Sequence, residues 1–122
     1  MYKKILIATD GSPTAGKAAQ KGMVLARQLG ADVFLLSVGE PEQAGPIVEA
    51  AAKQLGDGVS VTPLAIAGQP ADVILTVAEE EGVDLIVVGN KGMTDAKRFL
   101  LGNVPNQISH HAPCNVLIVK TT

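Results

Sequence analysis

Three glycines spaced as G-x2-G-x9-G carry the strongest chemical signal in this sequence. Gly89 and Gly92 directly follow a run of apolar residues, and Gly102 comes after nine further residues. Because glycine has no Cβ, the backbone can turn sharply at these positions and approach a bound group closely. Asn103 suits a helix N-cap and Pro105 a first helical turn, so we expect a helix to begin here. Since the free N–H groups at a helix N-terminus bind anions, the segment predicts a phosphate-binding loop.

A second group of polar residues, 9–12, follows the first apolar run of the chain. Asp10, Ser12 and a histidine are the residue types of a hydrolytic triad, but no G-x-S-x-G motif surrounds a nucleophile. His110 and His111 are adjacent, and neighbouring helical residues point about 100° apart, which argues against a shared metal ion. The sequence therefore favours a binding protein over an enzyme, with slow hydrolysis at most.

Residues 11–18 come within one position of the P-loop pattern G-x4-G-K-[ST]. Ala18 stands where the pattern needs a hydroxyl for Mg²⁺. A helix that begins at Pro13, after a capping serine, would also hold Gly16 and Lys17 within helical backbone and leave no loop around a phosphate. We therefore do not interpret this segment as a P-loop.

The elements that must position these residues are strands and helices in strict alternation. Buried-strand patterns alternate with helical patterns, and the expected strands are 5–8, 33–38, 59–67, 83–88 and 116–119, with helices at 13–29, 42–55, 71–81 and from Asn103 onward. Such alternation implies parallel pairing through right-handed crossovers. The prediction is one α/β domain over residues 1–122, a doubly wound five-stranded parallel sheet with helices on both faces, Rossmann-like or flavodoxin-like.

Composition excludes several classes of protein. The formal net charge is -2 and no basic run occurs, so nucleic acid is not an expected partner. No stretch approaches the roughly 20 apolar residues that span a bilayer, so we expect no membrane association and a cytoplasmic location. Cys114 is the only cysteine among 122 residues. It can form no internal disulfide, and we expect it to pack as a small hydrophobe.

The spacing G-x2-G-x9-G, placed after the fourth expected strand and before a capped helix, resembles the nucleotide motif of the universal stress protein family. The similarity extends over essentially the whole chain, and its other main segments are 3–12, 68–70, 83–89 and 111–119. The resemblance implies a stress-response regulator or signalling module that binds ATP or another adenine nucleotide, with or without Mg²⁺.

The resemblance also implies where the nucleotide binds. In ATP-binding members the residue matching Asp10 lies by the ribose, that matching Val38 offers backbone groups to the adenine, and the glycine loop wraps the phosphates. The implied nucleotide-binding residues are Ala8, Thr9, Asp10, Val38, Val88, Gly89, Gly92, Gly102, Asn103 and Val104.

Asn103 departs from the family motif, which usually has serine or threonine after its last glycine. An asparagine amide can cap a helix and donate to phosphate, but it is bulkier than a hydroxyl. A module that binds cyclic AMP, or no nucleotide, is therefore a second interpretation. An FMN carrier is a third, although the sequence has no tryptophan and its one tyrosine, Tyr2, lies near the start.

The strand expected at residues 116–119 would be an exposed apolar edge in a monomer, and such edges are usually covered or paired. Antiparallel pairing of this strand across a two-fold axis, as in members of the family, predicts a homodimer.

Overall fold

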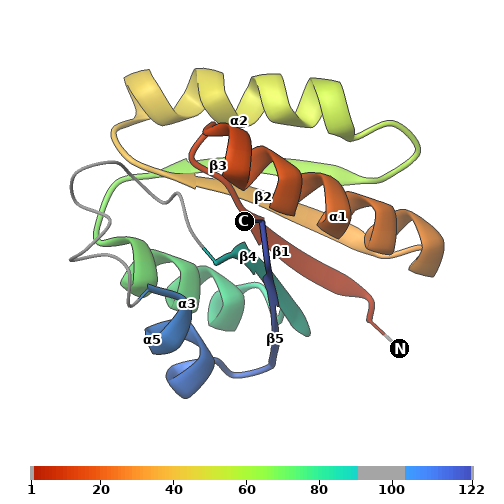
Figure 1. Ribbon diagram of the computed structural model, residues 1–122. Coiled ribbons are helices and arrows are strands. Elements are labelled where there is room, and N and C mark those ends of the chain that lie inside the picture. Colours follow the sequence, from red (N-terminus) through yellow and green to blue (C-terminus); the bar gives the residue numbers. More distant parts are fainter. Residues whose placement is uncertain (1, 91–103, 122) are drawn as a thin grey trace.

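Five parallel strands form one sheet, and helices lie on both of its faces (Figure 1). The computed structural model describes residues 2–90 and 104–121. Its elements are β1 (Lys4–Ala8), α1 (Pro13–Leu29), β2 (Asp32–Val38), α2 (Pro41–Leu55), β3 (Val61–Ile66), α3 (Pro70–Glu80), β4 (Leu85–Gly89), α5 (Val104–His111) and β5 (Asn115–Val119). The predicted α/β class with a doubly wound five-stranded parallel sheet is confirmed.

The strand order β3-β2-β1-β4-β5 places β1 and β4 side by side at the centre of the sheet. This is the Rossmann order rather than the flavodoxin order, and sequence reasoning had left both open. The chain builds outward from β1 through β2 to β3, and then returns to pair β4 with the other side of β1. Connections therefore leave β1 and β4 in opposite directions, which makes the carboxyl ends of these strands the expected ligand crevice.

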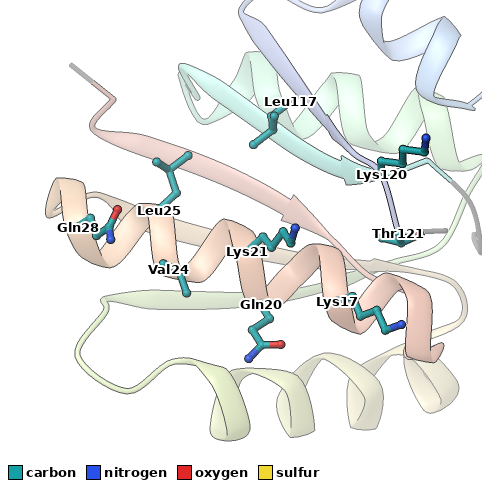
Figure 2. A pocket seen from close by; sticks show the side chains of 9 residues that line it. All are labelled: Lys17, Gln20, Lys21, Val24, Leu25, Gln28, Leu117, Lys120 and Thr121. Carbon is teal, nitrogen blue, oxygen red and sulfur yellow. The ribbon is translucent and has the colours of Figure 1, made fainter.

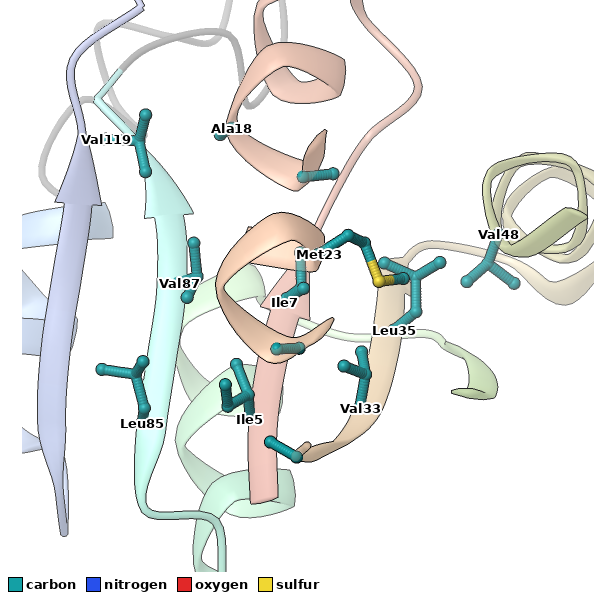
Figure 3. Packing of buried hydrophobic residues seen from close by; sticks show 13 residues of the cluster. Ile5, Ile7, Ala18, Met23, Val33, Leu35, Val48, Leu85, Val87 and Val119 are labelled. Carbon is teal, nitrogen blue, oxygen red and sulfur yellow. The ribbon is translucent and has the colours of Figure 1, made fainter. Parts of the chain in front are cut away.

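Two hydrophobic layers hold the helices on the sheet. Ile5 and Ile7 of β1 face α1 and α2 and pack in one cluster with Met23 and Val48 (Figure 3). Leu6 lies on the other face of β1, in a cluster with residues of α3 and α5. Successive strand residues point to opposite faces, so a central strand covered on both sides is apolar throughout. Complete burial of each large aliphatic side chain contributes about 1.5–3 kcal/mol.

The first helix begins and ends where its capping residues predict. Ser12 is the N-cap, and its Oγ accepts a hydrogen bond from the backbone N–H of Ala15 at 3.2 Å. Gly30 ends the helix in a left-handed conformation with φ of 66°. Gly16 and Lys17 lie within this helix, which agrees with our rejection of a P-loop.

Most predicted elements have bounds that differ from the structure by one or two residues, and α2 and β3 are two examples. The second helix begins at Pro41 rather than 42, and it continues through Pro46. Proline fixes its own φ in the helical range and lacks only one N–H donor, so the helix can accommodate it at a cost. The third strand is limited to Val61–Ile66, shorter than the predicted 59–67. Within the described ranges, no helix is long and apolar enough to cross a membrane.

Two glycines of α1 provide a matched test of this packing. A Cβ at Gly22 would lie 2.8 Å from Ile7 Cδ1 and 3.2 Å from Val87 Cγ1, whereas a Cβ at Gly16 would meet nothing within 4 Å. Ile7 and Val87 are fully buried and cannot move aside freely. We expect Gly22→Ala to lower the free energy of unfolding by about 1–3 kcal/mol through overpacking. Gly16→Ala should raise it by about 0.5–1 kcal/mol. Urea denaturation of both variants measures this, and equal stabilities would contradict it.

Candidate functional site

The turn between β1 and α1 is held in one conformation by hydrogen bonds of its own side chains. The backbone N–H of Thr9 donates to the carbonyl oxygen of Leu36 at 2.9 Å, which fixes the turn against β2. Gly11 N–H donates to Thr9 Oγ1 at 3.2 Å, and Ser12 N–H donates to Asp10 Oδ1 at 2.9 Å. Gly11 has φ of +82°, a conformation that favours glycine. The turn is thus preorganised.

Asp10 is the predicted site residue whose side chain can reach a ligand from this turn. It is half-buried, and one carboxylate oxygen is engaged by Ser12. An ionised carboxylate accepts several hydrogen bonds, so further ones from ligand hydroxyls remain available. Thr9 differs, because it is only 4% exposed and its hydroxyl already accepts from Gly11. Thr9 can therefore offer backbone groups, but its side chain serves the turn.

Four other predicted site residues meet in one apolar cluster. Ala8, Val88 and Val104 are buried together, and Val38 is half-buried against them. Val88 and Val104 are each 1% exposed, so their side chains belong to the core. Val88 positions the backbone at the end of β4, and Val104 positions the backbone at the start of α5. Val38, at the end of β2, is by contrast partly exposed.

Asn90 connects the start of the glycine motif to β5. Gly89 pairs with Val119, and the Asn90 N–H donates to the Val119 carbonyl oxygen at 2.9 Å. Asn90 Oδ1 accepts from the N–H of Thr121 at 2.9 Å and from its Oγ1 at 3.0 Å. Sequence reasoning missed this residue, although its position between two motif glycines could have indicated an anchor. The predicted site residues Gly92, Gly102 and Asn103 lie outside the described residues.

The connection between β2 and α2 is short and brings α2 against the turn. Only Gly39 and Glu40 separate the two elements. Ile47 of α2 approaches the turn so closely that its Cγ2 would lie 3.0 Å from a Cβ at Gly11. A cleft of about 410 Å³ opens between α1 and α2 beside this contact, and it is lined by Thr9, Gly11, Ser12, Gly16, Ala19, Pro46, Ile47, Ala50, Ala51, Gln54 and Leu55.

The two histidines do not assemble a metal site. His110 and His111 end α5 and are both exposed, with ring centroids 6.4 Å apart and ring planes inclined by 55°. Across the described parts of the chain, no three His, Cys, Asp or Glu side chains are grouped so that they could hold a metal ion. The described site residues bring together the half-buried carboxylate of Asp10 and backbone groups at the carboxyl ends of β1, β2 and β4.

Comparison with known proteins agrees with this arrangement at the level of family. The model of the universal stress protein family matches residues 1–57 and 47–120. The chain belongs to the universal stress protein family. Universal stress protein MJ0531 of Methanocaldococcus jannaschii is 33% identical, with 98% of this chain and 83% of the relative covered. Universal stress protein YxiE of Bacillus subtilis is 32% identical, with 98% of this chain and 100% of the relative covered.

Solved structures of universal stress proteins have the same fold. MJ0577 of Methanocaldococcus jannaschii superposes with a TM-score of 0.86 at 33% identity, covering 100% of this chain and 98% of that one. A universal stress protein in complex with cAMP gives a TM-score of 0.84 at 27% identity, covering 99% and 98%.

This universal stress protein lacks residues that a relative carries. The alignment with MJ0531 extends over 141 positions, although this chain has 122 residues, so the relative carries residues that this chain lacks. The family model matches in two overlapping pieces that meet at residues 47–57. We infer that the missing residues fall around α2, in agreement with the two-residue connection from β2.

Cys114 packs as predicted and is a poor nucleophile. It is half-buried against the α3 and α5 layer, and burial, followed by the nearby Asp84 carboxylate, raises the pKa of its thiol. Little thiolate is then present near neutral pH. We expect Ellman's reagent at pH 7.5 to react with the folded protein at least about tenfold more slowly than with the urea-unfolded chain. The rate should rise steeply at alkaline pH. Equal rates in the folded and unfolded protein would contradict this.

Proposed function

We propose that this universal stress protein binds an adenine nucleotide, with ATP as the first candidate, and acts as a regulator of the stress response. The observation that carries the proposal is the preorganised turn that presents Asp10 at the switch point between β1 and β4. The glycine motif begins at the adjacent strand end. A relative of the same fold in complex with cAMP supports an adenine ligand.

The residues at this edge fit the parts of a nucleotide. The Asp10 carboxylate would accept hydrogen bonds from ribose hydroxyls, and the backbone at Val38 would meet the edge of the base. The glycines of the motif, together with Asn103 and the N-terminus of α5, would bind the phosphates. The phosphates of a bound nucleotide would themselves supply oxygen ligands to any Mg²⁺.

We propose no efficient catalysis at this site. Asp10 is the carboxylate of the turn, and a hydrogen bond to Ser12 already engages one of its oxygens. Within the described turn, residues 9–12, no histidine or second carboxylate stands beside Asp10 to activate a water, so hydrolysis of bound ATP would be slow at most. A turnover of about 1 s⁻¹ or more would contradict this, since that rate is typical of dedicated enzymes.

Asp10→Asn tests the site without removing the turn. The amide oxygen can still accept from Ser12, but the charge that strengthens the bonds to ribose is lost. We expect ATP to bind about tenfold more weakly in calorimetric titration, since charged hydrogen bonds exceed neutral ones by roughly 1.4 kcal/mol. Asp57→Asn, at an exposed position after α2, should leave binding unchanged. Unaltered affinity in Asp10→Asn, with an unaltered urea midpoint, would contradict the proposed role of Asp10.

A cyclic AMP-binding or nucleotide-free module is the second candidate function. The cAMP complex of a relative favours a module that binds cyclic AMP over one that binds no nucleotide. Freshly purified protein can be denatured and any released nucleotide identified by mass spectrometry, followed by titration with ATP, AMP and cyclic AMP. Release or binding of ATP supports the main proposal. An empty protein that gives no binding heat with any of the three supports the nucleotide-free module.

We also propose that this universal stress protein is a homodimer through residues 116–119. β5 lies at the edge of the sheet, and Leu117 and Ile118 are 39% and 40% exposed. Antiparallel pairing of two β5 strands would satisfy the unpaired backbone groups of this edge.

Ile118→Lys tests the dimer, because a two-fold axis would bring the two introduced charges close together. We expect sedimentation equilibrium at micromolar concentration to give twice the chain mass of 12.5 kDa for the native protein. The variant should sediment as the single chain. A native protein that remains a monomer under these conditions would contradict the proposed dimer.

A further inference from the structure

A groove runs between α1 and β5, on the face of the sheet away from α3 and α5. Its volume is about 610 Å³. The lining side chains are Lys17, Gln20, Lys21, Val24, Leu25, Gln28, Leu117, Lys120 and Thr121 (Figure 2). None of these residues belongs to the nucleotide site proposed above, so the groove is a separate surface.

In the described parts of the chain, no helix covers β5 on this face of the sheet. α1 packs on β1 and β4, and α2 packs on β2 and β3. β5 has α5 on its opposite face. Leu117 of β5 is therefore 39% exposed, and Val24 of α1 is 43% exposed. Both line the groove, with the half-buried Leu25 beside them. Exposed apolar side chains that share one hollow are typical of an interaction surface.

Three lysines give the groove a charge opposite to that of the whole chain. Lys17 and Lys21 stand one turn apart on α1, and Lys120 follows β5. Figure 2 shows these lysines toward one end of the groove and Gln28 at the other. Among the described residues, no carboxylate lines the groove, and none of the three ammonium groups pairs with one. Like charges at i and i+4 are unfavourable on a helix, so an anionic group would relieve their repulsion.

We propose that this groove binds an acidic amphipathic helix of a partner protein. From Lys17 to Gln28, α1 rises about 16 Å, which matches about three turns of a helix lying alongside it. The apolar face of that helix would cover Val24 and Leu117 and so complete the helical layer over β5. Its acidic residues would meet Lys17, Lys21 and Lys120. These lysines also favour the negative, C-terminal end of the partner helix dipole. Since Lys17 lies near the N-terminus of α1, the partner helix would run antiparallel to α1.

The test uses the full chain and a defined peptide probe. The probe is a fluorescein-labelled, alanine-based helical peptide of about fourteen residues, with leucines along one face and three glutamates in its C-terminal turns. A second peptide carries lysines in place of the glutamates. The protein has no tryptophan, so the label on the peptide supplies the anisotropy readout. We expect the native protein to bind the glutamate peptide about tenfold more tightly than the lysine peptide.

A charge reversal identifies the surface that binds. In the variant Lys17→Glu/Lys21→Glu the preference should invert, so that the lysine peptide binds more tightly. Lys53→Glu, on the exposed face of α2 and outside the groove, should keep the native preference. Leu117→Ser should weaken both peptides by a similar factor of about three to ten, because it removes apolar contact rather than charge. Circular dichroism confirms that each variant is folded.

Three outcomes would overturn the proposal. The first is no saturable binding of the glutamate peptide up to about 1 mM, the weakest affinity of interest here. The second is a preference in Lys17→Glu/Lys21→Glu that equals that of the native protein. The third is a native dimer that Lys17→Glu/Lys21→Glu dissociates and Lys53→Glu does not, because the groove would then hold a second copy of the chain.

Discussion

The pairing of β1 with β4 is the contact on which the candidate site depends, because it joins two distant segments that each end in a motif. Asp84 fixes this pairing at the amino ends of the strands. Its N–H donates to the Lys4 carbonyl oxygen at 2.9 Å, and its carboxylate accepts the backbone N–H groups of Lys3 and Lys4 at 2.9–3.2 Å. Because β1 is apolar on both faces, its side-chain pattern distinguishes registers poorly, and these hydrogen bonds of Asp84 help to fix the register. The same register sets where Asp10 and Gly89 emerge at the other end.

Local sequence was sufficient for the elements because each carries its own physical marker. A central strand such as β1 is buried on both faces, so its apolar run identifies it without any periodic alternation. Ser12 and Gly30 mark the ends of α1 through capping and a left-handed backbone. Strand order was harder to predict, since the return of the chain from β3 to β4 depends on contacts between distant segments. Sequence patterns could therefore not separate the Rossmann order from the flavodoxin order.

The predicted site residues differ in what the structure adds to them. Asp10 and Val38 emerge with accessible side chains, whereas Thr9 uses its hydroxyl within the turn and Val88 and Val104 are buried. A family motif identifies positions along the chain, but side-chain burial depends on the layers that α3 and α5 form with the sheet. Asn90 was missed for a related reason, since its partner Thr121 is distant in sequence and becomes adjacent only when β5 pairs with β4.

Thr121 links the glycine motif to the groove between α1 and β5. It lines the groove, and it donates two hydrogen bonds to Asn90, which lies between the first two glycines of the motif. On the opposite wall, α1 begins at the turn that presents Asp10 and carries Lys17 and Lys21 along the groove. A ligand that moved Asn90 would therefore also move one end of the groove. Coupling between two binding sites is reciprocal. If nucleotide binding changes the affinity of the groove for its occupant, the occupant therefore changes the affinity for nucleotide by the same factor.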